Sequence, residues 1–168
     1  MVKYNLLWIC ISFFLVFPMT SFASVAPFYE QLNTLSNSSA STQSDYGNLA
    51  NTVCSMYYED PEGELASQYI YACATIYWDS YVRFNDTSDM DNALRYYRLV
   101  ATNYDNGVAA MGYIETSAIY EMQDDFASAL YNYNRLKTRF PGTEFADLAQ
   151  TKIEEINSLF GIETQEPL

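Results

Sequence analysis

The sequence predicts an all-α protein in which about six helices stack as short helical hairpins, a small α-α solenoid. Apolar and aromatic residues recur every three or four positions over most of the chain beyond residue 45, which is typical of amphipathic helices. No segment alternates apolar and polar residues as a strand does. Several apolar positions also recur after 36 residues, as expected of stacked units that cover one another.

The expected helical faces lie within residues 45–60, 66–77, 93–101, 110–120, 126–140 and 143–160. Asp91 stands where the third helix needs a cap, and Asp124 and Asp125 precede the fifth. Thr143 stands before the sixth, after Pro141 stops the fifth. Hydroxyl and carboxylate oxygens accept the free backbone N–H groups of a helix start, so these residues predict the boundaries.

Residues 1–23 have the features of a secretory signal peptide. Lys3 precedes an apolar run, and the small residues Ser21 and Ala23 precede a cleavage point at Ser24. The alternative is an uncleaved anchor, but the apolar run of residues 5–19 is shorter than the roughly 20 residues that a spanning helix needs. We expect an exported chain without an integral membrane segment once the signal is removed.

The remaining chain divides into three parts. Residues 24–44 include the polar run of residues 33–44 and are predicted to form a flexible leader. Residues 45–161 are predicted to form the helical domain, and residues 162–168 a tail.

Composition disfavours several classes of function. The chain has 21 acidic and 8 basic residues, a net charge of −13, so nucleic acid is not an expected partner. It has no histidine, the commonest general base and the commonest metal ligand. We therefore expect no catalytic residue, no cofactor and no metal.

Two kinds of acidic motif are candidate sites, namely adjacent carboxylate pairs and a cluster of oxygen ligands. The pairs Asp124-Asp125 and Glu154-Glu155 are adjacent in sequence, whereas acid–base catalysis needs two carboxyl groups in different environments of one pocket. Residues 85–89 are rich in oxygen ligands but lack the spacing and glycine of a calcium loop, which favours a capped turn.

The repeat carries a resemblance to a known family. A shift of 36 residues superimposes three core positions, Ala93 on Ala129, Tyr97 on Tyr133 and Val100 on Leu136. The spacings of the tetratricopeptide repeat are matched by Tyr113, Thr116, Ser117, Tyr120, Ala129, Tyr133 and Pro141. Three of these depart from the family pattern, because Tyr113 replaces its tryptophan, Thr116 its leucine and Ser117 its glycine.

The chain therefore resembles a tetratricopeptide-repeat superhelix. Its clearer repeat spans residues 110–143 and a weaker one spans residues 67–106, flanked by helices over residues 45–60 and 143–160. Residues 78–91 exceed the usual repeat length and are expected to extend a helix and protrude. Residues 140–146 resemble the inter-repeat turn of bacterial envelope members, which implies a periplasmic protein, with secretion as the alternative.

The resemblance also implies a binding groove, because the first helices of such hairpins line a concave surface. Carried over, the groove residues are Tyr71, Thr75, Trp78, Met111, Ile114, Ala118, Met122 and Leu148. An apolar groove with tryptophan and methionine suits an apolar helix or extended peptide. The alternative is that the leader covers it, through Phe28, Tyr29 and Leu32.

Cys54 and Cys73 are the two cysteines beyond the predicted signal. An even pair in an exported chain favours a disulfide, here between successive antiparallel helices. The alternative is two small buried thiols.

These observations support an exported protein-interaction module that binds a partner segment without catalysis. The alternative is a structural subunit or accessory factor of an envelope secretion, pilus or outer-membrane assembly. An exported enzyme or effector is a remote alternative.

Overall fold

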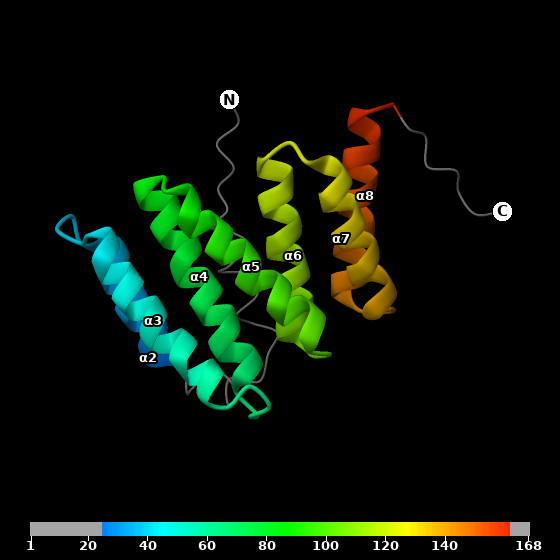
Figure 1. Cartoon of the computed structure of the whole chain (residues 1–168). Coiled ribbons are helices and arrows are strands. Elements are labelled where there is room, and N and C mark those ends of the chain that lie inside the picture. The colour runs from blue at the N-terminus through cyan, green and yellow to red at the C-terminus, as the bar shows by residue number, and fades with distance from the viewer. Residues whose placement is uncertain (1–24, 162–168) are drawn as a thin grey trace.

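The computed structural model describes residues 25–161, and all regular structure in that range is helical (Figure 1). Its helices are α2 (Ala26–Asn37), α3 (Gln43–Glu59), α4 (Ala66–Phe84), α5 (Thr87–Asn103), α6 (Gly107–Met122), α7 (Phe126–Arg139) and α8 (Glu144–Leu159). The all-α prediction is confirmed for these residues. The predicted signal, residues 1–23, and tail, residues 162–168, lie outside them.

The helices pack in chain order. Each contacts its neighbour in the sequence, and two further contacts, α2 with α4 and α4 with α6, join alternate helices. Figure 1 shows the resulting row, from α2 and α3 at one end to α7 and α8 at the other. Each helix therefore buries its apolar face against elements close to it in the chain.

Residues 26–37 form a packed helix, α2, within the segment predicted to be a flexible leader. Phe28 makes an edge-on ring contact with Tyr69 of α4, with centroids 6.3 Å apart. Arg83 Nη1 donates to the carbonyl of Ser36 at 3.0 Å. The polar residues after position 32 concealed the short apolar face around Leu32, which is 7% exposed. A helix this short is only marginally stable alone, and its contacts with α3 and α4 stabilise it.

The start of α5 also differs from its prediction. The helix begins at Thr87 with Asp86 as its N-cap, whereas Asp91 lies within it. Residues 78–84 continue α4, as expected, but the insertion does not protrude. Asp89 is buried and accepts hydrogen bonds from Ser80 Oγ at 2.7 Å and Gln43 Nε2 at 2.9 Å. These bonds tie the lengthened hairpin to the start of α3.

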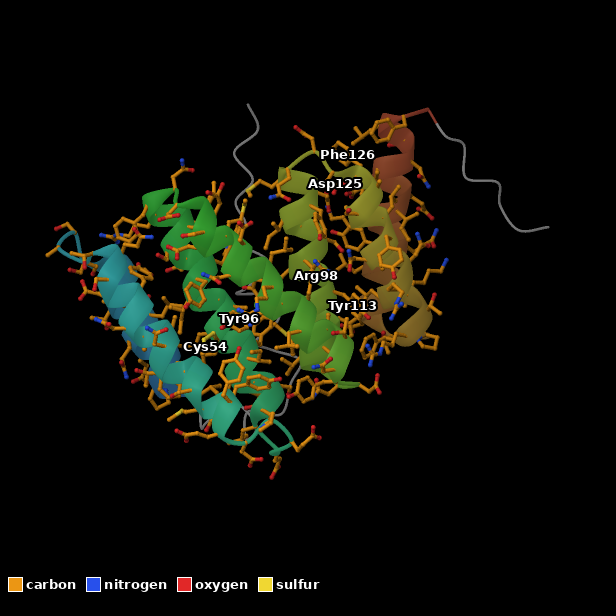
Figure 2. The ribbon with its side chains drawn as sticks, in the orientation of Figure 1. Cys54, Tyr96, Arg98, Tyr113, Asp125 and Phe126 are labelled. Atoms are coloured by element: carbon orange, nitrogen blue, oxygen red, sulfur yellow. A yellow bond between two sulfur atoms is a disulfide. The ribbon has the colours of Figure 1, made fainter. Side chains whose placement is uncertain are left out.

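Other boundaries follow the predicted capping chemistry. Asp125 caps α7, accepting from the backbone N–H of Ser128 at 3.1 Å, and lies just before Phe126 (Figure 2). Thr143 caps α8, accepting from the N–H of Ala146 at 3.4 Å. Asn106 caps α6 in the same way. Side-chain oxygens thus satisfy N–H groups that no helix bond can reach.

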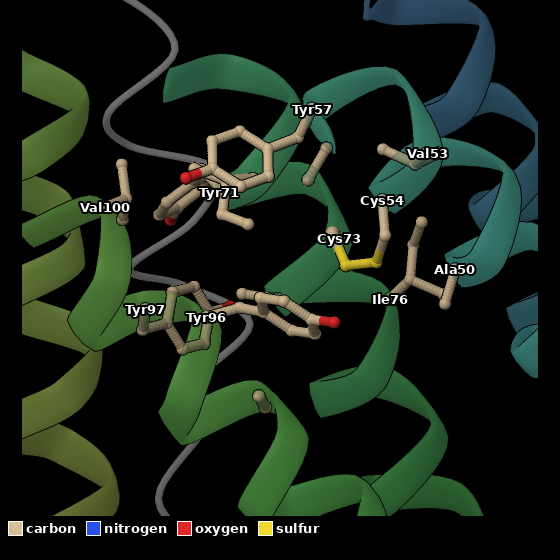
Figure 3. Packing of buried hydrophobic residues seen from close by; sticks show 14 of the residues in the cluster. Ala50, Val53, Cys54, Tyr57, Tyr71, Cys73, Ile76, Tyr96, Tyr97 and Val100 are labelled. Atoms are coloured by element: carbon tan, nitrogen blue, oxygen red, sulfur yellow. A yellow bond between two sulfur atoms is a disulfide. The ribbon is translucent and has the colours of Figure 1, made fainter. Parts of the chain in front are cut away.

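The predicted disulfide joins Cys54 of α3 to Cys73 of α4, with Cα atoms 5.4 Å apart. Figure 3 shows it among the buried side chains of α3, α4 and α5. A second buried cluster, which includes Tyr133 and Leu136, joins α6, α7 and α8. The disulfide therefore reinforces the N-terminal half of the stack.

Gly112 sets the closest approach of α6 to α5. A Cβ atom at this position would lie 2.6 Å from Val100 Cγ1 and 2.8 Å from the backbone oxygen of Tyr97. Because backbone atoms cannot rotate away as a side chain does, Gly112→Ala should lower the free energy of unfolding by about 1–3 kcal/mol in urea denaturation.

Gly47→Ala is the matched control for that substitution. Gly47 lies within α3, and a Cβ there would meet no atom within 4 Å. This change should raise the free energy of unfolding by about 0.5–1 kcal/mol, because alanine loses less backbone entropy in a helix. Equal effects of the two substitutions would contradict the packing described for Gly112.

Replacement of both cysteines, Cys54→Ser with Cys73→Ser, should lower the free energy of unfolding by about 3 kcal/mol, because the unfolded chain is no longer closed into a loop. Urea denaturation of oxidised and reduced protein measures the effect. Reduction should destabilise the wild type and leave the double variant unchanged. Two free thiols in the unreduced, denatured mature chain would contradict the disulfide.

Candidate functional site

The residues predicted to line a groove lie on three helices and differ in exposure. Tyr71, Thr75 and Trp78 lie on α4, Leu148 lies on α8, and α6 carries Met111, Ile114, Ala118 and Met122. Tyr71 and Ile114 are buried, whereas Met122 is 44% exposed. The side chains of Thr75, Trp78, Met111, Ala118 and Leu148 are partly exposed.

Tyr71 and Thr75 hold α4 against its neighbours. Tyr71 Oη donates to Glu115 Oε1 of α6 at 3.2 Å. Tyr97 Oη of α5 donates to Thr75 Oγ1 at 3.2 Å, and the Thr75 hydroxyl donates to the carbonyl of Tyr71 at 3.0 Å. Tyr71 and Thr75 thus stabilise the packing of α4 against α5 and α6, whereas the sequence predicted only a partner-contact role for them.

Four of the remaining predicted groove residues pack in or against two different buried clusters. Trp78 and Met111 pack against the N-terminal cluster, which contains the disulfide. Leu148 packs against the C-terminal cluster, to which Ile114 belongs. The residues predicted to line a groove therefore do not share one buried cluster, and Met122 is the most exposed of them.

Glu115 is a buried acid that sequence reasoning missed. It is 7% exposed, and burial raises the pKa of its carboxyl to about 7, partly offset by the hydrogen bond from Tyr71. A signal for it exists, because Glu115 is the sole charged residue within residues 107–120. A lone acid in a long uncharged stretch of a helix is a candidate for burial with a shifted pKa.

Two further polar atoms on these helices are buried. Gln68 Oε1 on α4 and Thr116 Oγ1 on α6 have no hydrogen-bond partner within the described range. Gln68 precedes Tyr71 by one helical turn, on the helix that meets α6. An unsatisfied buried polar atom costs free energy, so these two atoms lower the stability of the packing between α4 and α6.

The acidic motifs have structural partners. Asp86 is the N-cap of α5, as expected for a capped turn over residues 85–89. It also accepts a hydrogen bond from Gln43 Nε2 at 2.8 Å. No group of three or more histidine, cysteine or acidic side chains that could hold a metal occurs among residues 25–161. In the same range, no helix combines the length and apolar character needed to cross a membrane.

Comparisons with protein-family models, curated proteins and solved structures found no match to this chain.

Glu115→Gln should change how stability depends on pH. The carboxyl binds its proton more tightly in the folded state, with a pKa of about 7 against an ordinary value of 4.5. The free energy of unfolding of the wild type should therefore fall as pH rises from about 4.5 to about 7, by at most about 3 kcal/mol.

Glutamine does not ionise, so the variant should gain stability relative to the wild type between pH 5 and pH 8. Urea denaturation at both pH values measures this, with Glu59→Gln, which removes an exposed carboxyl, as the control. A difference between variant and wild type that stays constant with pH would contradict a buried titrating Glu115.

Proposed function

We propose that this chain is an exported, non-catalytic interaction module of the bacterial cell envelope that binds an apolar segment of a partner protein. The partner lies against α4, α6 and α8, the helices that the tetratricopeptide-repeat resemblance assigns to the concave face of a superhelix. One observation carries the proposal. Helices α4 and α6 contact each other, and they carry apolar side chains that remain partly exposed at Trp78 and Met111 and 44% exposed at Met122.

The chemistry of this surface supports an apolar partner. Tryptophan supplies a large contact area, and methionine adapts its shape to an irregular surface. Affinity comes from burial of these side chains, and no covalent step is involved.

The cellular location is part of the proposal. The predicted signal, residues 1–23, directs export, and the turn at residues 140–146 resembles envelope members of the family. A disulfide between Cys54 and Cys73 is in keeping with an oxidising compartment such as the periplasm.

A second candidate is a subunit or accessory factor of a larger envelope assembly. The observation that favours it is the C-terminal end of α8, where Leu159 and its neighbour Phe160 are 70% and 57% exposed. A helical array that ends in exposed apolar residues can be extended by another subunit.

Site-specific photo-cross-linking in periplasmic extract distinguishes the two. A photoreactive residue at Met111 or Leu148 should yield one common partner adduct, whereas the exposed control Asn134 on α7 should not. Trp78→Ala should reduce the adduct about tenfold by removing a large apolar anchor, with helicity unchanged in circular dichroism.

Equal adducts at Asn134 and Met111 would contradict the groove. Adducts confined to a probe at Leu159 would instead favour the assembly subunit.

A further inference from the structure

A pocket of about 460 Å³ lies between α5, α6 and α7. Its lining includes Arg98 from α5, Tyr113 and Tyr120 from α6, and Ser128, Tyr131 and Arg135 from α7. Figure 2 shows Arg98 and Tyr113 on neighbouring helices of this region. The volume falls within the range of small-ligand sites and far exceeds that of a simple inorganic ion.

The charge of the pocket is opposite to that of the chain. The protein carries a net charge of −13, yet the pocket is lined by two arginines and by no carboxylate. The ion pairs of the described residues involve Arg139 and Lys152, and neither Arg98 nor Arg135. In so acidic a protein, two guanidinium groups without an internal carboxylate mark a site where an external anion is favoured.

Two side chains that line the pocket, Tyr113 and Arg135, take part in hydrogen bonds within the protein. Arg139 Nη1 donates to Tyr113 Oη at 3.3 Å and to the carbonyl of Ala101 at 2.7 Å. Tyr113 is 2% exposed, so this ring is fixed. Arg135 Nη1 donates to Tyr131 Oη at 3.4 Å, and its guanidinium lies 6.0 Å from the centre of that ring. Arg135 is thereby oriented before any ligand arrives.

We propose that this pocket binds an acidic segment of a partner protein, with a carboxylate paired to Arg98 and Arg135. Guanidinium groups match the planar carboxylate, and the tyrosine faces offer apolar area to the rest of the peptide. Ser128 and Asn132 on the rim can pair with peptide groups. Its lining includes none of the groove residues predicted on α4, α6 and α8, so it is separate from that surface.

The probe is a fluorescent hexapeptide of alternating glutamate and glycine, compared with its glutamine counterpart by anisotropy and by NMR of ¹⁵N-labelled protein. The acidic peptide should bind and shift amide signals of α5 and α7, although the net charge of the protein repels it. Arg98→Gln and Arg135→Gln should each raise Kd about tenfold, the loss of one charge-assisted pair.

Arg95→Gln is the matched control. Arg95 is an exposed arginine one turn before Arg98 on α5, and it stacks on Tyr96, outside the pocket. Its loss removes the same charge from the same helix and should change Kd less than about twofold.

Four results would overturn the proposal. They are equal binding of the glutamine peptide, equal weakening by Arg95→Gln, no binding of the acidic peptide at millimolar concentration, and displacement of the peptide by inorganic phosphate or glucuronate at its own Kd. The last result would assign the pocket to a free anion or an acidic sugar. Thermal unfolding of each variant separates these outcomes from misfolding.

Discussion

Close packing between helices that are neighbours in sequence is the constraint on which this structure depends. At the contact of α6 with α5, the space at Gly112 is already filled by Val100 and by the backbone of Tyr97. Short helices of this kind are marginal alone, so each needs the face of the next to persist. The disulfide between α3 and α4, and the bonds of Arg139 to α5 and α6, fasten particular junctions of the same row.

The same constraint produces two chemically different surfaces. Contacts of α2 with α4 and of α4 with α6 place alternate helices together, and they carry apolar side chains and the buried acid Glu115. The intervening helices α5 and α7 border a pocket with two arginines across α6. A partner with one apolar and one acidic segment would match both surfaces, and the two sites would then reinforce each other through effective concentration.

The candidate groove shows what a repeat pattern can predict and what it cannot. The positions taken from the repeat spacing identified α4, α6 and α8, but spacing does not report burial. Tyr71 and Ile114 belong to the interior, whereas Trp78 and Met122 keep exposed surface. Glu115 was overlooked because an acid in a helix is ordinarily solvated, and its environment is made by residues such as Tyr71, 44 positions away. The arginine pocket was overlooked because its lining residues come from three helices.

The sequence by itself determined the helical class and the caps at Asp125 and Thr143, and it favoured the pairing of Cys54 with Cys73 over two free thiols. Helical periodicity and capping are local, since they depend on residues three or four positions apart, and the cysteines lie on adjacent helices. Only the tertiary structure decided the helix α2 and the arginine pocket. Both depend on contacts between residues far apart in the chain, and a local sequence pattern does not report the free energy of such contacts.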